Sequence, residues 1–348
     1  MQHLIKLIKN KKSHKTIYYI KQVVWSYLAP RSFKLNYKKK LYKLLNDETS
    51  KIFFDRVNYY NKMSNSFSLP DEDVYNKNIS KEKNKDSIII LAKNIFKINC
   101  SSAYKYDCNR YLSCFNKNFL TACSMGDVTQ IPKLPSIIKS RPIKDRKQNQ
   151  NSIILKLDRV RHFKFIQDKT PYKDKINKLV WRGKIQKKQP HRIRFLQKIY
   201  GNHLCNVAQT NKKQEHAYGN YLSIQEQLKY KFILCIEGND VATNLKWAMS
   251  SNSLCFMTKP KYETWFMEGT LKPGIHYVEL KDDYSDLEEK INYYSQNTEE
   301  AQYIIQNAHS HVEIFKNKTH ENLISLLVLE KYFNLSGQIK SEYQYLFK

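Results

Sequence analysis

From about residue 178 onward, short apolar runs alternate with segments that have helical periodicity. Strands that alternate with helices are joined by crossovers, so the strands lie parallel and helices cover both faces of the sheet. We therefore predict a doubly wound α/β domain that is closed by three helices. The predicted strands are 178–184, 203–208, 232–236, 253–257 and 276–280, and the predicted helices are 189–200, 223–231, 240–251, 262–269, 284–297, 298–315 and 320–333.

The first half of the chain has a weaker pattern. Apolar runs predict strands at 88–91, 119–127 and 153–157, whereas 70–86 and the Pro-rich stretch 131–152 have the composition of loops. The predicted domain organisation is a basic helical region (1–85), a first α/β domain (86–175) and a second α/β domain (176–318). The last helix, 319–348, is predicted to fold back onto the first half.

The chain is strongly basic, with 60 Lys and Arg against 32 Asp and Glu and a formal charge of +28. Such an excess attracts polyanions, although about half of it can reflect a compositional bias toward Lys, Asn, Ile and Tyr. Residues 1–50 hold twelve Lys and Arg, two acidic residues and interleaved apolar side chains. This region suits either an anionic membrane surface or an ordinary basic helix packed on the domain. No apolar run is long enough to span a bilayer.

The cysteines and the sequence motifs exclude several classes of protein. Seven Cys without a CxxC pair or metal-ligand spacing indicate reduced thiols in a cytosolic protein, including the closely spaced Cys108 and Cys114. The chain has no GxGxxG, GxxxxGK[ST], HExxH or EF-hand motif. These absences argue against a usual dinucleotide enzyme, a P-loop NTPase and the common metal sites.

The run 232–236 stops at Glu237-Gly238-Asn239-Asp240, and a helical segment follows. Gly238 permits a backbone angle that most residues avoid, and Asn239 and Asp240 can cap the helix. A helix start at the carboxyl end of a strand presents free N–H groups, which suits a phosphate. Many α/β proteins have the same turn without a ligand, so both interpretations stay open here.

Four blocks in series resemble one family. They are "GDVTQIPKLPSIIKSRPI" with "NSIILKLDRVRHF", "KLVWRGK", "YKFILCIEGNDVATNLKWAMSSNSLCFM" and "ETWFMEGTLKPGIHYVELKDDYSDLEEKI". Together they resemble the bacterial lipopolysaccharide-modifying branch of glycosyltransferase family 90, which is related to protein O-glucosyltransferases and capsule xylosyltransferases. The resemblance covers about 123–315.

The resemblance implies a GT-B-like fold, in which two Rossmann-like domains face a cleft, here with extra N-terminal helices. It implies that the C-terminal domain holds a nucleotide sugar and that the N-terminal domain holds the acceptor. Transfer would invert the anomeric centre without a bound metal or other cofactor. Asp127 in "GDVTQIP" matches the family's general base, although a carboxylate there can also simply cap a turn. Arg182 in "VWRGK" matches an arginine on the diphosphate, with a structural salt bridge as its alternative, and Trp181 beside it is expected in the core.

Further donor contacts follow from the same resemblance. The turn from Gly238 to Thr243 would bind the diphosphate through backbone N–H groups. Asn244 stands where related enzymes have an arginine, so another cation would have to supply that charge. Glu263, expected to open a short helix, can accept from ribose hydroxyls or simply favour the helix start. The full set of donor-site candidates is Arg182, Gly238, Asn239, Asp240, Val241, Ala242, Thr243, Asn244, Lys246, Glu263, Lys139 and Arg141.

The remaining polar residues in these blocks carry weaker predictions. His276 suits a satisfied residue at a strand end. Asp158, Arg161 and His162 fall in the acceptor half, where they could contact a phosphorylated sugar.

The sequence thus predicts an inverting transferase that moves a hexose, from UDP-glucose or UDP-galactose, to lipopolysaccharide or lipooligosaccharide core. Its partners would be an anionic lipid-anchored glycan and an anionic membrane, at the cytoplasmic face of the bacterial inner membrane. One alternative keeps the family with another acceptor: capsule, cell-wall polymer or protein. The other is a nucleic-acid-binding protein driven by the charge, but no zinc knuckle, RRM block or KH loop supports it.

Overall fold

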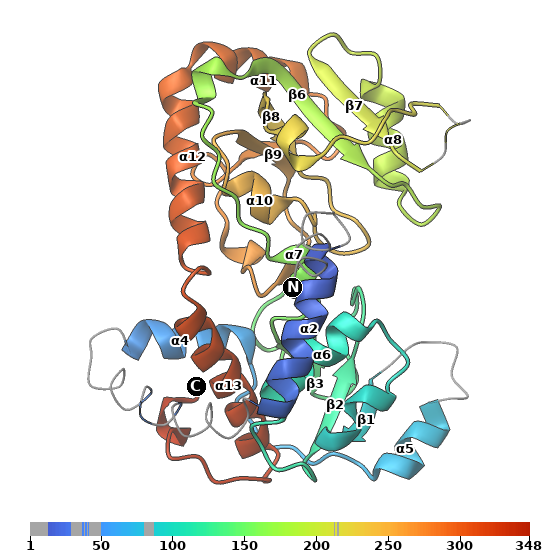
Figure 1. The fold of residues 1–348 in the computed structure, drawn as a ribbon, viewed down its shortest axis with the longest axis vertical. Helices are drawn as coiled ribbons and strands as arrows, with labels where there is room; N and C mark the ends of the chain where they lie inside the picture. The colour runs from blue at the N-terminus through green and yellow to red at the C-terminus, as the bar shows by residue number, and fades with distance from the viewer. Residues whose placement is uncertain are drawn as a thin grey trace, which may run out of the picture. The chain divides into compact units, whose positions relative to one another are not determined.

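The computed structural model describes residues 13–28, 37, 39, 41, 50–79, 87–211, 213 and 216–348. The chain divides into two compact units, whose folds can be followed in Figure 1. Unit 1 contains the described residues up to Val160 together with Asn317–Lys348, and unit 2 is Arg161–Lys316. The predicted domains were defined by function, and their boundaries stay predictions.

The sheet of unit 1 has the strand order β1-β2-β3-β5. Strand β1 is antiparallel to β2, and β2, β3 and β5 are mutually parallel. The three predicted strands are present, but the loop predicted at 131–152 is wrong in part, because β3 and β4 lie within it. The prolines around β3 suggested a loop, yet its Ile137 and Ile138 are fully buried between neighbouring strands. The bounds are β1 (Ile88–Leu91), β2 (Leu120–Ser124), β3 (Ser136–Ile138), β4 (Ser140–Pro142) and β5 (Ser152–Ile154).

The helices of unit 1 include one that the sequence analysis missed. The segment predicted as a loop at 70–86 contains α5 (Glu72–Ile79), whose start is capped by the Asp71 carboxylate, which accepts from the N–H groups of Asp73 and Val74. The capping signal was present in "PDEDV", but the polar composition outweighed it. The other helices are α2 (Ser13–Leu28), α4 (Ser50–Tyr60), η1 (Ala92–Lys97), α6 (Ser102–Leu112), α13 (Lys318–Leu335) and η4 (Gln344–Leu346); α7 (Arg159–His162) crosses from unit 1 into unit 2.

Helix α13 joins the C-terminal segment to the core of unit 1. It lies beside α4 in Figure 1 and is buried along most of its length. Its Tyr332 hydroxyl donates to the Pro135 carbonyl at 3.0 Å and accepts from the Ala122 N–H at 3.1 Å. The last predicted helix is therefore a structural element of the unit that also holds Asp127.

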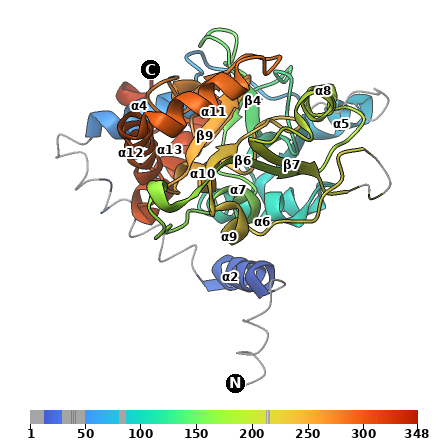
Figure 2. The same cartoon turned by 90° about the horizontal axis from the view of Figure 1, so that it is seen from above.

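The sheet of unit 2 is entirely parallel, with the order β11-β9-β8-β6-β7. This agrees with the predicted α/β sheet. Side chains alternate between its faces. Leu179, Trp181 and Phe232 belong to the core shared with α8 and α11, while α10 lies on the opposite face (Figure 2). The bounds are β6 (Ile176–Gly183), β7 (Cys205–Gln209), β8 (Tyr230–Leu234), β9 (Leu254–Thr258), β11 (Val278–Leu280), α8 (Pro190–Ile199), α9 (Ile224–Gln227), α10 (Leu245–Met249), α11 (Leu287–Gln296) and α12 (Thr298–Glu313).

The strand order of unit 2 reverses at β6. The chain passes from β6 to β7 on one side, and then to β8 and β9 on the other. In open α/β sheets, ligands bind outside the carboxyl ends of the strands at such a reversal. The carboxyl ends of β6 and β8 are therefore the first place to look for a site.

Three predictions in unit 2 are wrong at least in part. The helix predicted at 223–231 is only α9, because β8 already starts at Tyr230. The helix predicted at 240–251 begins only at Leu245, and the helix predicted at 262–269 is instead strand β10 (Tyr262–Thr264) followed by a turn and the 3₁₀ helix η3 (Glu268–Thr270). The remaining short element is η2 (Tyr172–Asp174). Among the described helices, none is long and apolar enough to cross a membrane.

Candidate functional site

The Gly238 turn has a different geometry from the one predicted. The φ angle of Gly238 is not positive, so the backbone does not require glycine there. Asn239 and Asp240 do not cap α10, because that helix starts five residues after Asp240 and has no side-chain cap. The turn is instead held by the Gly238 N–H, which donates to the Val241 carbonyl at 3.3 Å.

The rest of the turn is anchored to β8. The Asn244 amide donates to the Leu234 carbonyl at 2.9 Å, which fixes the approach to α10. Val241 and Ala242 are buried, whereas Thr243 is exposed. Helix α10 has only five residues, so its dipole offers little to a phosphate.

Helix α8 supplies the charge beside this turn. Arg192 donates from Nε to the Glu237 carbonyl at 2.8 Å and from Nη2 to the Ile236 carbonyl at 3.0 Å. A Cβ on Gly238 would lie 3.5 Å from Nη2 of Arg192, so the guanidinium is in contact with the turn. Arg192 was not among the predicted site residues. The sequence feature that could have identified it is its place in the first turn of the helix after β6.

Two neighbours fix the start of α8 against the same turn. Gln189 donates to the Asn239 side-chain oxygen at 3.0 Å, and the His191 ring lies 2.8 Å from the Glu237 carbonyl. Pro190 occupies the first turn of the helix, where its missing N–H costs nothing. The helix start at the Gly238 turn is therefore that of α8, not that of α10.

The environment of Arg192 is unusual for a buried cation. Its guanidinium lies 5.6 Å from the Trp181 ring centroid, and no described carboxylate forms an ion pair with it. Burial lowers the pKa of Arg192 to about 10, which still leaves it charged at neutral pH. Trp181 itself is buried, as predicted. A partly buried cation that is held by carbonyl groups and an aromatic ring, rather than by a carboxylate, can attract an anion.

Arg182 lies at the end of β6 but is directed toward β7. It donates to the carbonyl oxygens of Trp181 at 2.9 Å and Asn206 at 2.7 Å, to the Asn206 side chain at 2.6 Å and to the Asn220 carbonyl at 3.0 Å. Burial lowers its pKa. The structure thus gives Arg182 a role in joining β6 to β7, and its contact with a diphosphate stays a prediction.

Glu237 is the acidic group at this edge of the sheet. Its Oε1 accepts from the backbone N–H groups of Lys261 at 2.9 Å and Tyr262 at 3.2 Å. Burial raises the pKa of Glu237 to about 7, even though these two N–H groups favour the ionised form. The carboxyl group is therefore partly protonated near neutral pH.

The structure does not support donor roles for two other candidates in unit 2. The Lys246 ammonium is fully buried in an ion pair with Glu268 and lies 5.2 Å from the Phe266 ring centroid. Glu263 is buried in β10 and does not open a helix. Both side chains are enclosed by the protein, so we favour structural roles for them.

In unit 1, Asp127 lies in the loop after β2. It directly follows Gly126, whose φ of 125° is an angle that favours glycine. Its Oδ1 lies 2.5 Å from the Lys139 ammonium. The lysine side chain is 2% exposed and the carboxylate 27% exposed, so Asp127 keeps contact with solvent while Lys139 fixes its direction. Lys139 is thus the partner of the predicted base.

Arg141 has a structural role in unit 1. Its fully buried guanidinium donates to the carbonyl oxygens of Tyr59 at 2.7 Å and Tyr60 at 3.1 Å, at the end of α4, and to that of Ser152 at 2.8 Å. Helix ends leave such carbonyl groups without partners, so this cation satisfies the end of α4. No surface of Arg141 is left for a ligand.

The other polar candidates lie in separate surroundings. Asp158 is buried with a positive φ of 55°, and the Arg161 guanidinium lies 3.2 Å from the buried His162 ring. The His276 ring accepts from the Lys272 N–H at 3.0 Å, as expected for a satisfied histidine. All seven cysteines lie in the described part of the chain and are free thiols.

Comparisons with known proteins define the class. The sequence profile of glycosyl transferase family 90 matches residues 156–335, just over half of the chain. The chain is 42% identical to the O-glucosyltransferase LpsA of Dichelobacter nodosus, over 81% of this chain and 82% of that protein. It is 30% identical to protein O-glucosyltransferase 2 of Danio rerio over 38% of this chain and 28% of that protein, and 32% identical to human protein O-glucosyltransferase 3 over 27% and 18%.

These matches show that the protein is a glycosyltransferase, an enzyme that transfers a sugar from a donor to an acceptor. The chain belongs to glycosyl transferase family 90. The matched segment includes Arg182, Arg192 and the Gly238 turn, whereas Asp127 precedes it.

Proposed function

We propose that this enzyme transfers a glucose residue from a nucleotide sugar, with UDP-glucose favoured over UDP-galactose, to a sugar hydroxyl of lipopolysaccharide or lipooligosaccharide core. The name of the bacterial relative, an O-glucosyltransferase, supports glucose. The observation that carries the proposal is the contact of Arg192 with the Gly238 turn at the strand-order reversal of unit 2.

The donor is proposed to bind at this reversal. Its diphosphate would be bound by the Arg192 guanidinium and by backbone N–H groups of the turn from Gly238 to Thr243. Arg can donate two parallel hydrogen bonds to phosphate oxygens, and the start of α8 adds a positive dipole end. The Glu237 carboxyl group, also at this edge, can accept from a hydroxyl of the donor. Arg182 stays a second candidate for the diphosphate.

The acceptor side is proposed to lie in unit 1. Asp127 would take the proton of the acceptor hydroxyl as its oxygen attacks the anomeric carbon. The bond from that carbon to the diphosphate oxygen breaks, and the diphosphate leaves with the electron pair, so the anomeric centre is inverted. Arg192 would stabilise the charge on the leaving group, a role that a metal ion has in other transferases.

The arrangement and location of the enzyme are part of the same proposal. We propose a GT-B-like arrangement in which the two units face each other across the donor and acceptor. An anionic lipid-anchored acceptor suits a chain of charge +28, and the basic N-terminal region would contact the anionic cytoplasmic face of the bacterial inner membrane. A protein acceptor is the alternative, since eukaryotic relatives are named protein O-glucosyltransferases.

A transfer assay tests this proposal. The purified protein would be incubated with a panel of UDP-, GDP- and ADP-sugars and with truncated lipooligosaccharide cores, capsule fragments or peptides, and products would be followed by mass spectrometry. We expect a hexose to be added to a lipooligosaccharide core from UDP-glucose. Transfer to peptide alone would replace the acceptor, and transfer from UDP-galactose alone would replace the sugar. Failure of every donor to bind would overturn the donor site.

A further inference from the structure

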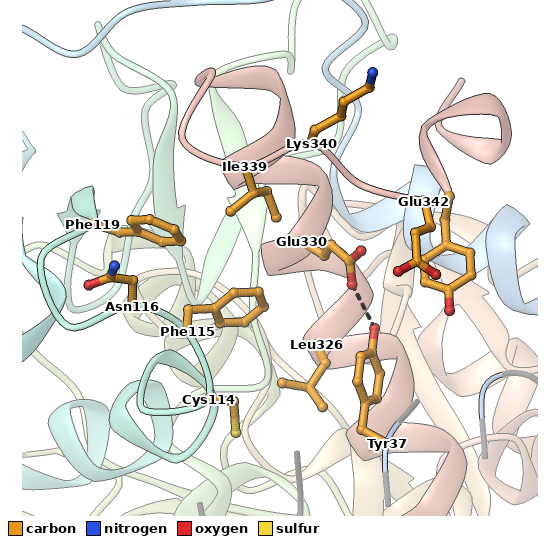
Figure 3. Close-up of a pocket in the computed structure, with 11 residues that line it drawn as sticks. Tyr37, Cys114, Phe115, Asn116, Phe119, Leu326, Glu330, Ile339, Lys340 and Glu342 are labelled. Carbon is orange, nitrogen blue, oxygen red and sulfur yellow. Dashed lines mark hydrogen bonds between the residues drawn. The ribbon is translucent and has the colours of Figure 1, made fainter. Parts of the chain in front are cut away.

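Unit 1 contains a cavity that the proposed reaction does not use. It has a volume of about 280 Å³ and lies between the loop after α6, helix α13 and the segment 339–343 (Figure 3). Its lining combines aromatic rings with two carboxylates, those of Glu330 and Glu342. Its volume is near the lower end of ligand pockets, which suits a small molecule or a single substituent.

The less exposed of the two carboxylates in this cavity is that of Glu330 on α13, since Glu342 is exposed. The Glu330 carboxylate accepts from the Tyr37 hydroxyl at 2.9 Å and from the Ser341 hydroxyl at 2.6 Å, and both donors are neutral. Within the described residues, no ion pair includes Glu330. Lys340 contributes to the lining, but its ammonium points away from Glu330 in Figure 3. Glu330 is thus a half-buried carboxylate with no cation beside it among the described residues, and such a charge is costly because buried charges are normally paired.

The neighbouring phenol of Tyr37 is the hydrogen-bond donor to this carboxylate. Burial, together with the adjacent Glu330 carboxylate, raises the pKa of Tyr37 well above its ordinary value. The phenol therefore stays protonated and donates to the carboxylate over the whole physiological pH range.

Aromatic rings form much of the remaining wall: those of Tyr37, Phe115, Phe119 and Tyr343. Phe115 and Phe119 pack against Phe333, with ring centroids 4.9 and 5.0 Å apart. This packing holds the two rings in place before any ligand arrives. In Figure 3 the ring of Phe115 extends toward Glu330.

These observations select one ligand chemistry. A phosphate or carboxylate would be repelled by Glu330, and an acyl chain would cover the carboxylate without compensating its charge. An ammonium group is attracted both by the carboxylate and by aromatic faces. We propose that this cavity is a binding site for a small ammonium compound, such as a primary amine or a trimethylammonium group. The site is independent of the proposed donor and acceptor.

Calorimetric titration of the full chain tests this inference. Choline and ethanolamine would be compared with 3,3-dimethylbutan-1-ol, which has the shape of choline without its charge. We expect the ammonium compounds to bind about tenfold or more tightly than the neutral alcohol, as carboxylate and cation–π attraction require. Equal affinity for the alcohol, or no binding of either ammonium compound at millimolar concentration, would overturn the inference.

Two variants assign the effect to the cavity. Glu330→Gln keeps the shape and the hydrogen bonds to Tyr37 and Ser341 but removes the charge, so choline affinity should fall about tenfold. Glu313→Gln, at an exposed glutamate of unit 2, is the matched control and should bind choline like the wild type. Unchanged affinity in folded Glu330→Gln would also overturn the inference. Flotation with phosphatidylcholine vesicles tests the source of the ammonium group. Co-flotation of the protein indicates a lipid head group, and a protein that stays at the bottom indicates a free amine.

Discussion

The carboxyl edges of the two sheets hold their cations in different ways. In unit 1, Lys139, Lys156 and Arg159 each lie within 2.5 to 2.6 Å of a carboxylate, on Asp127, Glu321 and Asp107 respectively. Arg141 donates to carbonyl groups instead, but it is fully buried. In unit 2, Arg182 and Arg192 donate to carbonyl groups and to an amide, and neither has a carboxylate partner among the described residues.

This difference suggests a division of tasks. Cations already neutralised by carboxylates gain little from a further anion, whereas cations held only by dipoles keep most of their attraction for one. The edge of unit 2 is therefore suited to an anionic diphosphate. The edge of unit 1 presents a partly exposed carboxylate that can accept a proton from a neutral hydroxyl. Each substitution below tests one side of this comparison.

The largest effect is expected from Asp127→Asn. An amide cannot accept the proton of the acceptor hydroxyl, so kcat should fall about 10²- to 10⁴-fold while the Kd for the nucleotide stays unchanged. The measurement is turnover with saturating donor, together with calorimetric binding of UDP. Asp55→Asn, at an exposed aspartate of α4, is the matched control.

Asp127→Asn also leaves the buried Lys139 ammonium without its carboxylate, which can cost several kcal/mol of stability. The double variant Asp127→Asn/Lys139→Met also removes the positive charge of Lys139. It should therefore recover the melting temperature without recovering turnover. If the double variant regains activity, Asp127 has only a structural role.

Arg192→Gln should produce the second-largest effect. Removing a charged donor from a phosphate contact costs about 1.5 to 3 kcal/mol, so the Kd for UDP should rise about 10- to 100-fold. Arg194→Gln, at an exposed arginine of the same helix, should change the Kd little. Affinity retained in folded Arg192→Gln but lost in Arg182→Gln would transfer the diphosphate contact to the end of β6, as first predicted.

Two glycines at the same edge allow a smaller but sharper test. A Cβ on Gly183 would lie 2.3 Å from the Trp181 ring, so Gly183→Ala should cost about 1 to 3 kcal/mol of stability. A Cβ on Gly238 would meet only ordinary contacts of 3.5 Å or more, so Gly238→Ala should fold normally. If the turn binds a diphosphate through its backbone, Gly238→Ala should still weaken UDP binding. Wild-type affinity in that variant would argue against a close approach of the ligand.

The strands and helices of unit 2 were largely predictable because its periodicity is clear. Parallel strands buried on both faces give short apolar runs, and all five were found. The errors come from residues whose local preference competes with burial: Asn239 and Asp240 signal a helix start, but Asn244 binds back to β8 and delays α10. Likewise, α5 was predicted as part of a loop because its sequence is polar, although Asp71 caps the helix.

The candidate site was less predictable than the fold. The Gly238 turn was predicted from the sequence. Its contact with α8 rather than α10 could not be predicted, because that contact depends on the strand order. It also could not separate Lys246, Lys139 and Arg141, each buried against its own partner, from Arg192, which lies against the turn. On a chain with 60 basic residues, only burial and partners distinguish such cations.

The last expected effect changes stability rather than activity: it is the pH dependence that Glu237 introduces. Its pKa is raised from 4.5 to about 7 by burial, so the folded protein binds more protons than the unfolded chain between these values. Stability should therefore fall as pH rises from about 4.5 to 7, by at most about 3 kcal/mol, since one pKa unit corresponds to about 1.4 kcal/mol. Glu237→Gln should remove this slope in urea unfolding, whereas Glu289→Gln, at an exposed position of α11, should keep it. A slope that persists in Glu237→Gln would mean that the carboxyl group at the unit 2 edge is already compensated, and that the two edges differ less than their ion pairs suggest.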